Sequence, residues 1–491
     1  MLMGYRALTD DVNDLINRNA AIKISDIRFV EDELRDNEAS PVRCRMLDGK
    51  RYYLGRHDIL EKKRKVINDS GELEVVENLE NNITIDNQYR KMVIQKTNYL
   101  CGNPITFRCD NENYSELIKV NLLSKNFHKK LKKITTEALN CYVAFLYVFI
   151  NESSQLDFKV FDSTQCIPGW TDEEREELDY LIRKYPVEVY EGQTKREKYI
   201  IEVYTSNGID YYTADRDGGH LSQGEPHKNY ITTVNGLEEK EYNWERLPVI
   251  PFKYNDECKT LLSCCKSLQD AINKIDSIFL DTFCEDKRNT VVVVTNYGGE
   301  DPKRIRNQMM KYGIIPIENT DDAPGGGIDT ISIDVNSQNY QVVREILKKS
   351  IIENCMGYDA KDDKLSGTPN QMNIQSMYND IDLDANGMET EFQSSLEMLM
   401  WFVNVFLRIT GKGDYSQVPY DFIFDRDMMM NENDIINNCK NSAGIISNKT
   451  IISNHPYVTD VQQELDQIKR EKEEEAQMYP DRLVDGDLDE E

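Results

Sequence analysis

The stretch that decides the fold lies at residues 374–409 and reads IQSMYNDIDLDANGMETEFQSSLEMLMWFVNVFLRI. Its apolar residues recur at steps of three or four, which is the spacing of one helix face. They are Ile374, Met377, Ile381, Ala385, Met388, Phe392, Leu396, Leu399, Val403 and Phe406. The stretch has no proline and one glycine, Gly387, so it predicts a continuous helix about 54 Å long. Because a small domain is shorter than that, we expect this helix to connect separate parts of the molecule.

The segment before this helix, residues 359–373, has the opposite character. It is polar and contains Gly367 and Pro369, both of which interrupt helices. We therefore predict a loop that leads directly into the long helix. This combination indicates a mechanical or assembly component more than a substrate pocket.

Composition narrows the class of protein. The 491 residues are 39% hydrophobic and 30% charged, and the length is typical of about three domains. A net charge of −28 argues against a general DNA-binding protein, because such proteins carry basic surfaces. It does not exclude a surface past which DNA moves without sticking.

Cysteine usage and hydropathy point to a reduced, soluble chain. Eleven cysteines include no C-x-x-C pair, which predicts reduced thiols, several of them in the core. The first nine residues lack the charged and apolar segments of a signal peptide. The most hydrophobic stretch, residues 141–150, is too short to span a bilayer and predicts a buried strand.

The first half of the chain mixes helices and strands. Apolar spacing predicts helices at residues 87–100 and 113–139. Between 141 and 255, β-rich runs predict strands at 141–150, 158–161, 187–190, 199–204 and 210–213. Among them, Thr171 with Glu174 resembles a helix cap and predicts a short helix at 171–185. The fold class is therefore α+β.

A helix, an insert and a second helix follow. Leu261, Cys265, Leu268, Ile272, Ile275 and Phe279 form an apolar stripe whose opposite face is polar, with Lys266, Asp270, Asn273 and Ser277. Residues 289–336 predict strands at 290–295, 314–317 and 330–334, with a helix at 302–311. A further helix is predicted at 338–356. These two helices are expected to run antiparallel and to carry the insert on a stalk.

After the long helix we predict a strand at 420–424 and helices at 431–441 and 458–475. Residues 471–491 contain ten acidic residues and two basic ones, which predicts a disordered acidic tail.

Motifs for catalysis are scarce. No G-x-x-x-x-G-K-[ST] phosphate loop, no G-x-S-x-G motif and no paired-histidine metal motif occurs among the 491 residues. Acidic pairs such as Asp362/Asp363 and Asp382/Asp384 are compatible with a Mg²⁺-dependent nuclease, although acids are so frequent here that such pairs are expected by chance. Two function classes therefore stay open at this point: a metal-dependent nuclease and an acidic helical scaffold protein.

Four strings, taken in order around the helix–insert–helix arrangement, resemble phage portal proteins of the siphophage type. They are YYLG at 52–55, YLCGNPITF at 99–107, LPVIPF at 247–252 and LSGT at 365–368. The resemblance extends over nearly the whole chain. It implies a ring of about twelve subunits at one capsid vertex, the channel for DNA entry in packaging and exit in ejection, and no enzymatic activity or cofactor.

The resemblance also implies a domain plan. Residues 1–256, together with 376–425, correspond to the wing, 257–287 and 337–357 to the two stem helices, and 288–336 to the clip. Residues 358–373 correspond to the tunnel loop, 374–411 to the long spanning helix, 426–475 to the crown and 476–491 to an acidic tail.

The functional residues that the resemblance implies fall into three groups. The tunnel loop facing DNA has Asp359, Lys361, Asp362, Asp363, Lys364, Ser366, Gly367 and Thr368. The channel side of the stem has Lys348 and Lys349, and the clip has Arg304, Arg306, Lys311, Asp321 and Asp322. Thr368 to Gln371 is less apolar than this loop is expected to be.

The implied partners are double-stranded DNA, the terminase large subunit, a head-completion or adaptor protein, and the major capsid and scaffolding proteins. No membrane partner is expected. The implied location is the portal vertex of the virion, and the host cytoplasm during assembly.

Overall fold

The computed structural model describes residues 26–67, 72–75, 80–215, 220–235, 238–284, 291–294, 328–331, 337–359, 371–426, 432–458 and 461–478. The chain divides into two compact units. One comprises Met1–Gly357 and Leu383–Arg426, and the other comprises Tyr358–Asp382 and Asp427–Glu491.

The core of the first unit is a three-stranded antiparallel sheet with helices packed against it. Its strand order is β13 (Val249–Lys253), β4 (Val143–Ile150) and β5 (Leu156–Val160). Helix α6 (Lys125–Cys141) packs against this sheet and against α3 (Pro41–Tyr53) and α4 (Gln88–Cys101). Residues 143–146 of β4 are all buried, so the predicted buried strand is confirmed.

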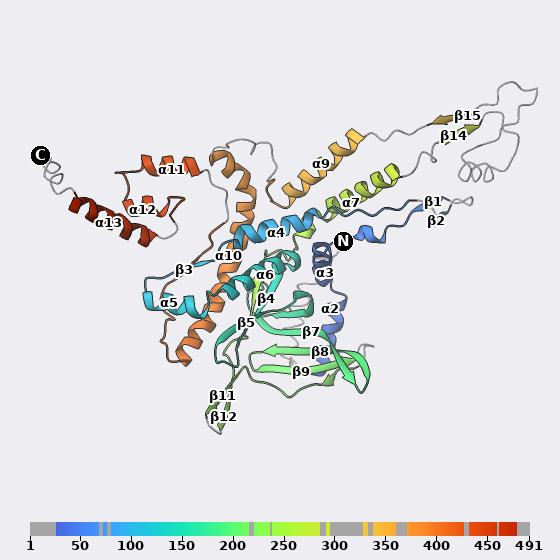
Figure 1. Ribbon diagram of the computed structural model, residues 1–491. Helices are drawn as coiled ribbons and strands as arrows, with labels where there is room; N and C mark the ends of the chain where they lie inside the picture. The colour runs from blue at the N-terminus through green and yellow to red at the C-terminus, as the bar shows by residue number, and fades with distance from the viewer. Residues whose placement is uncertain are drawn as a thin grey trace, which may run out of the picture. The chain divides into compact units, whose positions relative to one another are not determined.

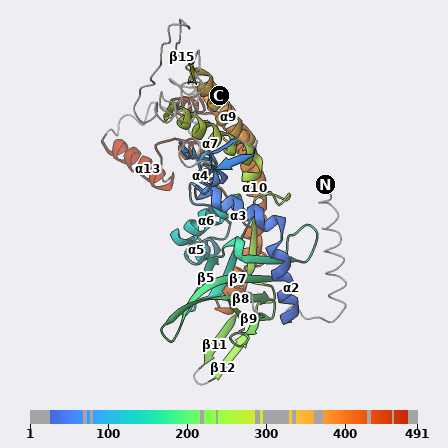
Figure 2. The same cartoon turned by 90° about the vertical axis from the view of Figure 1, so that its right-hand side faces the viewer.

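A second, five-stranded antiparallel sheet lies beside this core. Its order is β10 (Ser222–Gln223), β9 (Gly208–Asp215), β8 (Thr194–Thr205), β7 (Leu178–Glu191) and β6 (Cys166–Trp170). On one face, helix α2 (Ile27–Glu38) buries Val30 and Leu34 against this sheet, and α2 runs beside β7–β9 in both views (Figures 1 and 2). On the other face, Leu181 and Tyr204 join Val143 and Phe145 of the first sheet in one cluster.

The predicted helix at 171–185 is wrong, because residues from Leu178 onward form strand β7. Tyr180 and Ile182 face the α2 side while Leu181 faces the other side, which is the alternation of a strand. Strand β7 also pairs on both edges, with β6 and with β8. The cap-like Thr171 instead closes a turn, since its N–H donates to the carbonyl of Glu177 at 2.9 Å.

The predicted helix at 113–139 exists as two helices, α5 (Glu112–Asn121) and α6. Ser124 separates them by accepting a hydrogen bond from the backbone of Phe127, as an N-cap of α6 does. The 3₁₀ turns η1 (Asp58–Glu61) and η2 (Ser163–Gln165) complete this region.

Three two-stranded ribbons complete the β structure before the insert and after α10. They are β1 (Lys65–Ile67) with β2 (Leu73–Val75), β11 (Ile231–Asn235) with β12 (Glu238–Tyr242), and β3 (Thr106–Arg108) with β16 (Asp421–Ile423). The last pair confirms the predicted strand at 420–424. It brings Phe107 into contact with Phe422 and Tyr420.

Helices α7 (Leu262–Cys284) and α9 (Ser337–Asn354) confirm the two predicted helices around the insert. Within the insert, β14 (Val291–Val294) pairs antiparallel with β15 (Ile328–Ile331). Strand β14 confirms the strand predicted at 290–295, and β15 begins two residues before the one predicted at 330–334. The predicted helix at 302–311 and the predicted strand at 314–317 lie outside the described residues.

The long helix predicted from the apolar stripe is confirmed as α10 (Gln371–Ile409), which has 39 residues and begins three residues earlier than predicted. All stripe residues are buried except Met377, which is half-buried. In the first unit, Phe392 packs edge-on against Phe252 of β13 at 5.2 Å between ring centroids. The Ser395 hydroxyl donates to the Pro251 carbonyl at 2.7 Å, so α10 is fixed to the three-stranded sheet.

The second unit contains the first part of α10 and the helices α11 (Glu432–Asn441), α12 (Asn448–Ser453) and α13 (Val461–Met478). Helices α11 and α13 confirm two predictions, and α12 was not predicted. Helix α13 continues to Met478, three residues into the segment assigned to the acidic tail, and residues 479–491 lie outside the description. None of the described helices is both long and apolar enough to cross a membrane.

Candidate functional site

The predicted site residues fall unevenly within the described structure. Lys348 and Lys349 lie on α9, and Asp359 follows that helix. The other tunnel-loop residues lie outside the described ranges: Lys361, Asp362, Asp363, Lys364, Ser366, Gly367 and Thr368. The clip residues Arg304, Arg306, Lys311, Asp321 and Asp322 also lie outside them. The hairpin of α7 and α9 is therefore the part of the candidate site that the described residues contain.

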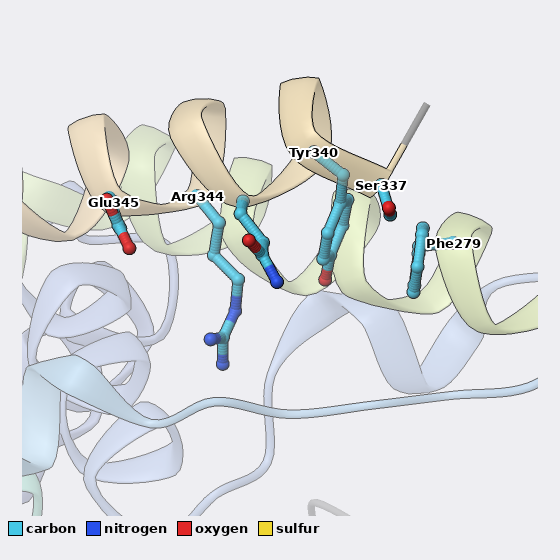
Figure 3. Close-up of a pocket in the computed structure, with 6 residues that line it drawn as sticks. Phe279, Ser337, Tyr340, Arg344 and Glu345 are labelled. Carbon is cyan, nitrogen blue, oxygen red and sulfur yellow. The ribbon is translucent and has the colours of Figure 1, made fainter. Parts of the chain in front are cut away.

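Helices α7 and α9 pack side by side and antiparallel (Figure 1). Phe279 of α7 stacks on Tyr340 near the start of α9, with ring centroids 3.9 Å apart. Asp276 lies about one turn before Phe279 on α7. Its carboxylate accepts a hydrogen bond from the Tyr340 hydroxyl and another from Nε of Arg344, at 3.0 Å. Figure 3 shows Tyr340 and Arg344 extending from the same side of α9, with Phe279 beside the Tyr340 ring.

The extended segment before α4 joins this hairpin through Asp86. Its carboxylate receives Arg344 Nη2 at 2.8 Å and Lys348 Nζ at 2.7 Å. Burial alone would raise the pKa of Asp86, but Lys348, Gln88 and Arg344 lower it below its ordinary value. Asp86 therefore stays ionised, and the charge of Lys348 is compensated within the chain.

A row of polar side chains on α7 holds the same extended segment by its backbone. Going along the segment, four backbone N–H groups donate to side-chain oxygens of α7. They are Asn82 to Asp281 at 2.5 Å, Thr84 to Ser277 at 3.0 Å, Asp86 to Asn273 at 3.2 Å and Tyr89 to Gln269 at 3.0 Å. The four acceptor residues are fully buried. We call this set the α7 polar row.

The spacing of the acceptors along helix α7 matches the spacing of every second N–H group along the extended segment. Four residues of helix rise about 6 Å, and two residues of extended chain rise about 6.6 Å. Acceptors at every fourth residue of α7 can therefore meet every second N–H from 82 to 86. The sequence carried this signal in the polar residues at positions 269, 273, 277 and 281. The sequence analysis placed Asn273 and Ser277 on the polar face of this helix, but nothing in the spacing indicated that this face is buried against a distant segment.

His57 closes the network at the base of the hairpin. Its ring is buried, stacks on Tyr52 at 4.3 Å, and places Nδ1 2.7 Å from Asn273 Nδ2 and Nε2 3.0 Å from the Tyr52 carbonyl. Because the Asn273 amide donates, Nδ1 must accept, and the proton lies on Nε2. Burial lowers the pKa of His57, so the ring is neutral.

The outer face of α9 differs from this polar interior. Val342, Val343 and Ile346 are 54%, 43% and 58% exposed, and they lie within about 100° of arc, on the side opposite Tyr340 and Arg344. Lys349 lies at the edge of this face, is 78% exposed and is 3.9 Å from Glu353. An exposed apolar face of this kind is typical of a protein–protein contact.

The described residues offer little for small-molecule chemistry. The hollow beside Tyr340 and Arg344 in Figure 3 measures about 190 Å³, which is smaller than the range of about 300–1,000 Å³ usual for ligand sites. A second hollow, lined by Asp58, Lys62 and Asp270, measures about 330 Å³, at the lower end of that range, and is largely open to solvent. In the described ranges, no three His, Cys, Asp or Glu side chains gather as metal ligands would. Asp384, proposed above as a nuclease carboxylate, instead pairs with Lys96 at 2.6 Å and accepts from the Tyr254 hydroxyl at 2.9 Å.

Comparisons with known proteins assign the family. The family described as "Phage portal protein, SPP1 Gp6-like" matches residues 41–478. The portal protein of Bacillus phage SPP1 is 27% identical over 98% of this chain and 94% of its own length. The portal protein of Clostridium phage phiCD119 is 27% identical over 86% of this chain and 91% of its own length.

Among solved structures, similarity is found to the "Neck of empty GTA particle computed with C6 symmetry", at a TM-score of 0.37 and 10% identity, covering 73% of this chain and 87% of that one. A native particle neck with C12 symmetry gives the same TM-score at 9% identity, with 74% and 88% covered. The match to the family spans most of the sequence. The chain therefore belongs to the SPP1 Gp6-like family of phage portal proteins.

Proposed function

We propose that copies of this chain form a ring of about twelve at the unique vertex of a phage capsid, through which double-stranded DNA enters and leaves. The observation that carries this proposal, beside family membership, is the two-sided character of the α7–α9 hairpin. Its inner side is fixed to its own chain by Asp86 and the α7 polar row. The outer face of α9 leaves three large aliphatic side chains exposed, as expected where a neighbouring subunit packs.

In this proposal the domain plan follows the family. Residues 1–256 with 376–425 form the wing, α7 and α9 the stem, 288–336 the clip, 358–373 the tunnel loop and 426–475 the crown. The β14–β15 ribbon supports the clip assignment, because it joins the two ends of an insert carried between the antiparallel helices. The clip residues dock the terminase first and a head-completion or adaptor protein later, and capsid and scaffolding proteins contact the outer body.

Electrostatics supports a conduit in which DNA stays mobile. A channel wall that bound phosphates would retain DNA, whereas an acidic wall repels it over about 8 Å at physiological salt. The chain carries a net charge of −28. On α9, Lys348 forms an ion pair with Asp86, which balances its charge. Lys349 is therefore the more available of the two predicted channel lysines for weak, reversible contacts.

Subunit contact through α9 is tested by placing charge on its apolar face. We expect Val342→Asp with Ile346→Asp to convert a ring into 57.1-kDa monomers, because burying two unpaired carboxylates costs several kcal/mol. Mass photometry of the purified full chain measures this directly. Gln341→Asp is the control for the position of the charge: it adds one carboxylate at an exposed position of α9 away from the three aliphatic residues.

The control variant should assemble as the wild type does, and all variants should keep the helical circular-dichroism spectrum. A wild-type chain that stays monomeric under every condition would contradict the proposed function. A double variant that still forms rings would remove α9 from the subunit contact.

A further inference from the structure

Helix α6 carries a basic face in an otherwise acidic chain. Residues 117–136 contain six lysines and no acidic residue, against a net charge of −28 for the whole protein. Four of these lysines occupy one side of α6: Lys125, Lys129, Lys132 and Lys133. At 100° per residue they fall within about 100° of arc. We call them the α6 basic face.

This face points away from the protein core. Phe127, Leu131 and Ile134 occupy the opposite side of α6 and are buried. Lys125, Lys129 and Lys133 are exposed, and Lys132 is half-buried. The packing of α6 therefore holds the four ammonium groups along one accessible side of a rigid helix.

The lysines of the α6 basic face differ from many others in having no carboxylate partner in the described structure. Lys130 on the same helix pairs with Asp157 at 2.7 Å, and Lys62, from the basic run at 62–65, pairs with Asp281 at 2.5 Å. No ion pair joins Lys125, Lys129, Lys132 or Lys133 to any described residue. Their positive charge is thus available to a partner.

This arrangement is unfavourable for α6 itself. Lys125, Lys129 and Lys133 follow at steps of four, where like charges repel by about 0.2–0.5 kcal/mol per pair. They also lie in the half of the helix nearest its positive dipole end. The same positive potential is felt at His128, whose pKa is lowered by burial and by Lys132. A face that costs stability in the isolated chain is expected to be neutralised by an anionic ligand.

We propose that the α6 basic face binds the phosphate backbone of duplex DNA outside the channel. The choice of partner rests on the proposed function, which brings DNA to this protein. Lys125 to Lys133 extend about 12 Å along the helix, a length over which B-DNA presents about seven phosphates. None of the exposed large apolar residues lies on α6, whereas protein interfaces are depleted in lysine and built around apolar or aromatic anchors.

The test uses the full chain and a fluorescent, covalently closed DNA minicircle, which cannot thread through a closed ring. Binding is measured by anisotropy at several salt concentrations. We expect Lys125→Gln, Lys129→Gln and Lys133→Gln together to weaken binding. The slope of log K against log salt should fall by about 2.7, which is about 0.9 for each of the three phosphates that the variant no longer neutralises.

The matched control is Lys195→Gln, Lys228→Gln and Lys259→Gln. These residues are 50%, 56% and 58% exposed, and each is paired with a glutamate. The control has the same change in net charge and should keep the wild-type salt slope. The α6 variant should melt at the wild-type temperature or above, because its substitutions remove repulsion between like charges.

Three results would overturn the inference: no minicircle binding by the wild type, equal binding by the α6 variant, or equal weakening in the control variant. Wild-type binding to polyglutamate but not to DNA would also overturn it and would identify an acidic protein as the partner. Mass photometry on the same samples keeps the two proposals separate. Rings without minicircle binding contradict this inference alone, whereas absence of rings contradicts the proposed function.

Discussion

At the scale of single residues, Gly49 marks a close approach of α3 to α6. A Cβ atom at this position would lie 2.0 Å from the carbonyl oxygen of Asn140. That carbonyl belongs to the last turn of α6, and the Asn140 side chain accepts the Tyr89 hydroxyl at 2.7 Å. The backbone of α6 at Asn140 is held by these contacts, so moving it away from a new side chain would cost free energy.

We predict that Gly49→Ala lowers the free energy of unfolding by about 1–3 kcal/mol, the usual cost of overpacking. Chemical denaturation of the purified protein measures the change. Gly387→Ala on α10 is the control, because a Cβ there meets nothing within 4 Å. It should stabilise the helix by about 0.5–1 kcal/mol. Equal effects at both positions would contradict the close approach.

His57 gives the first unit a predictable response to acid. Burial lowers its folded-state pKa below the ordinary 6.5, so below pH 6.5 the unfolded chain takes up this proton before the folded one does. Its contribution to stability is therefore complete above the unfolded pKa and is lost as the pH falls toward the folded pKa. Protonation would also set a proton on Nδ1 against the Asn273 amide.

We predict that the stability difference between wild type and His57→Gln shrinks as the pH falls from 7 toward 5. The measurement is a series of urea denaturations at constant ionic strength. Carboxylates that titrate in both proteins cancel in the difference. A difference that stays constant, or grows toward acid pH, would show that His57 is not held neutral.

At the scale of elements, regular spacing in the sequence made most helices predictable. The stripe from Ile374 to Phe406 predicted α10 to within three residues, because apolar residues that recur at steps of three or four over many turns fit a helix and not a strand. The local cap signal at Thr171 failed, since strand pairing on both edges of β7 outweighs a single side-chain hydrogen bond. Residue periodicity placed Asn273 and Ser277 of the α7 polar row on a polar helix face, but it did not indicate the partners of this row, which lie about 180–200 positions away.

The α7 polar row makes an element-scale prediction at its centre. Asn273→Leu removes the acceptor for Asp86 N–H and the donor to His57 Nδ1. Leaving buried polar groups unpaired should cost about 3 kcal/mol. Lys274→Leu on the exposed side of α7 should change stability by less than about 0.5 kcal/mol.

Hydrogen exchange at residues 82–89 gives the more specific readout. The N–H groups of Thr84 and Asp86 should exchange faster in Asn273→Leu than in Lys274→Leu. If exchange there were unchanged, the α7 polar row would not be what holds the extended segment.

At the scale of the whole molecule, sequence resemblance and family match agree on a portal protein. The pairing of α7 with α9 follows from residues that face each other, such as Phe279 and Tyr340. The predicted clip residues and nearly all the tunnel-loop residues lie outside the described ranges, so their roles stay predictions. The assignment of the outer face of α9 to a subunit contact is likewise a prediction, which rests on the exposed Val342, Val343 and Ile346.

The most direct test of the central proposal is single-particle electron microscopy of the purified full-length protein. The expected result is an annular particle with a central hole wide enough for duplex DNA, with α7 and α9 around the hole and Val342 and Ile346 buried between neighbouring subunits. A monodisperse monomer, or a closed oligomer without a hole, would contradict it.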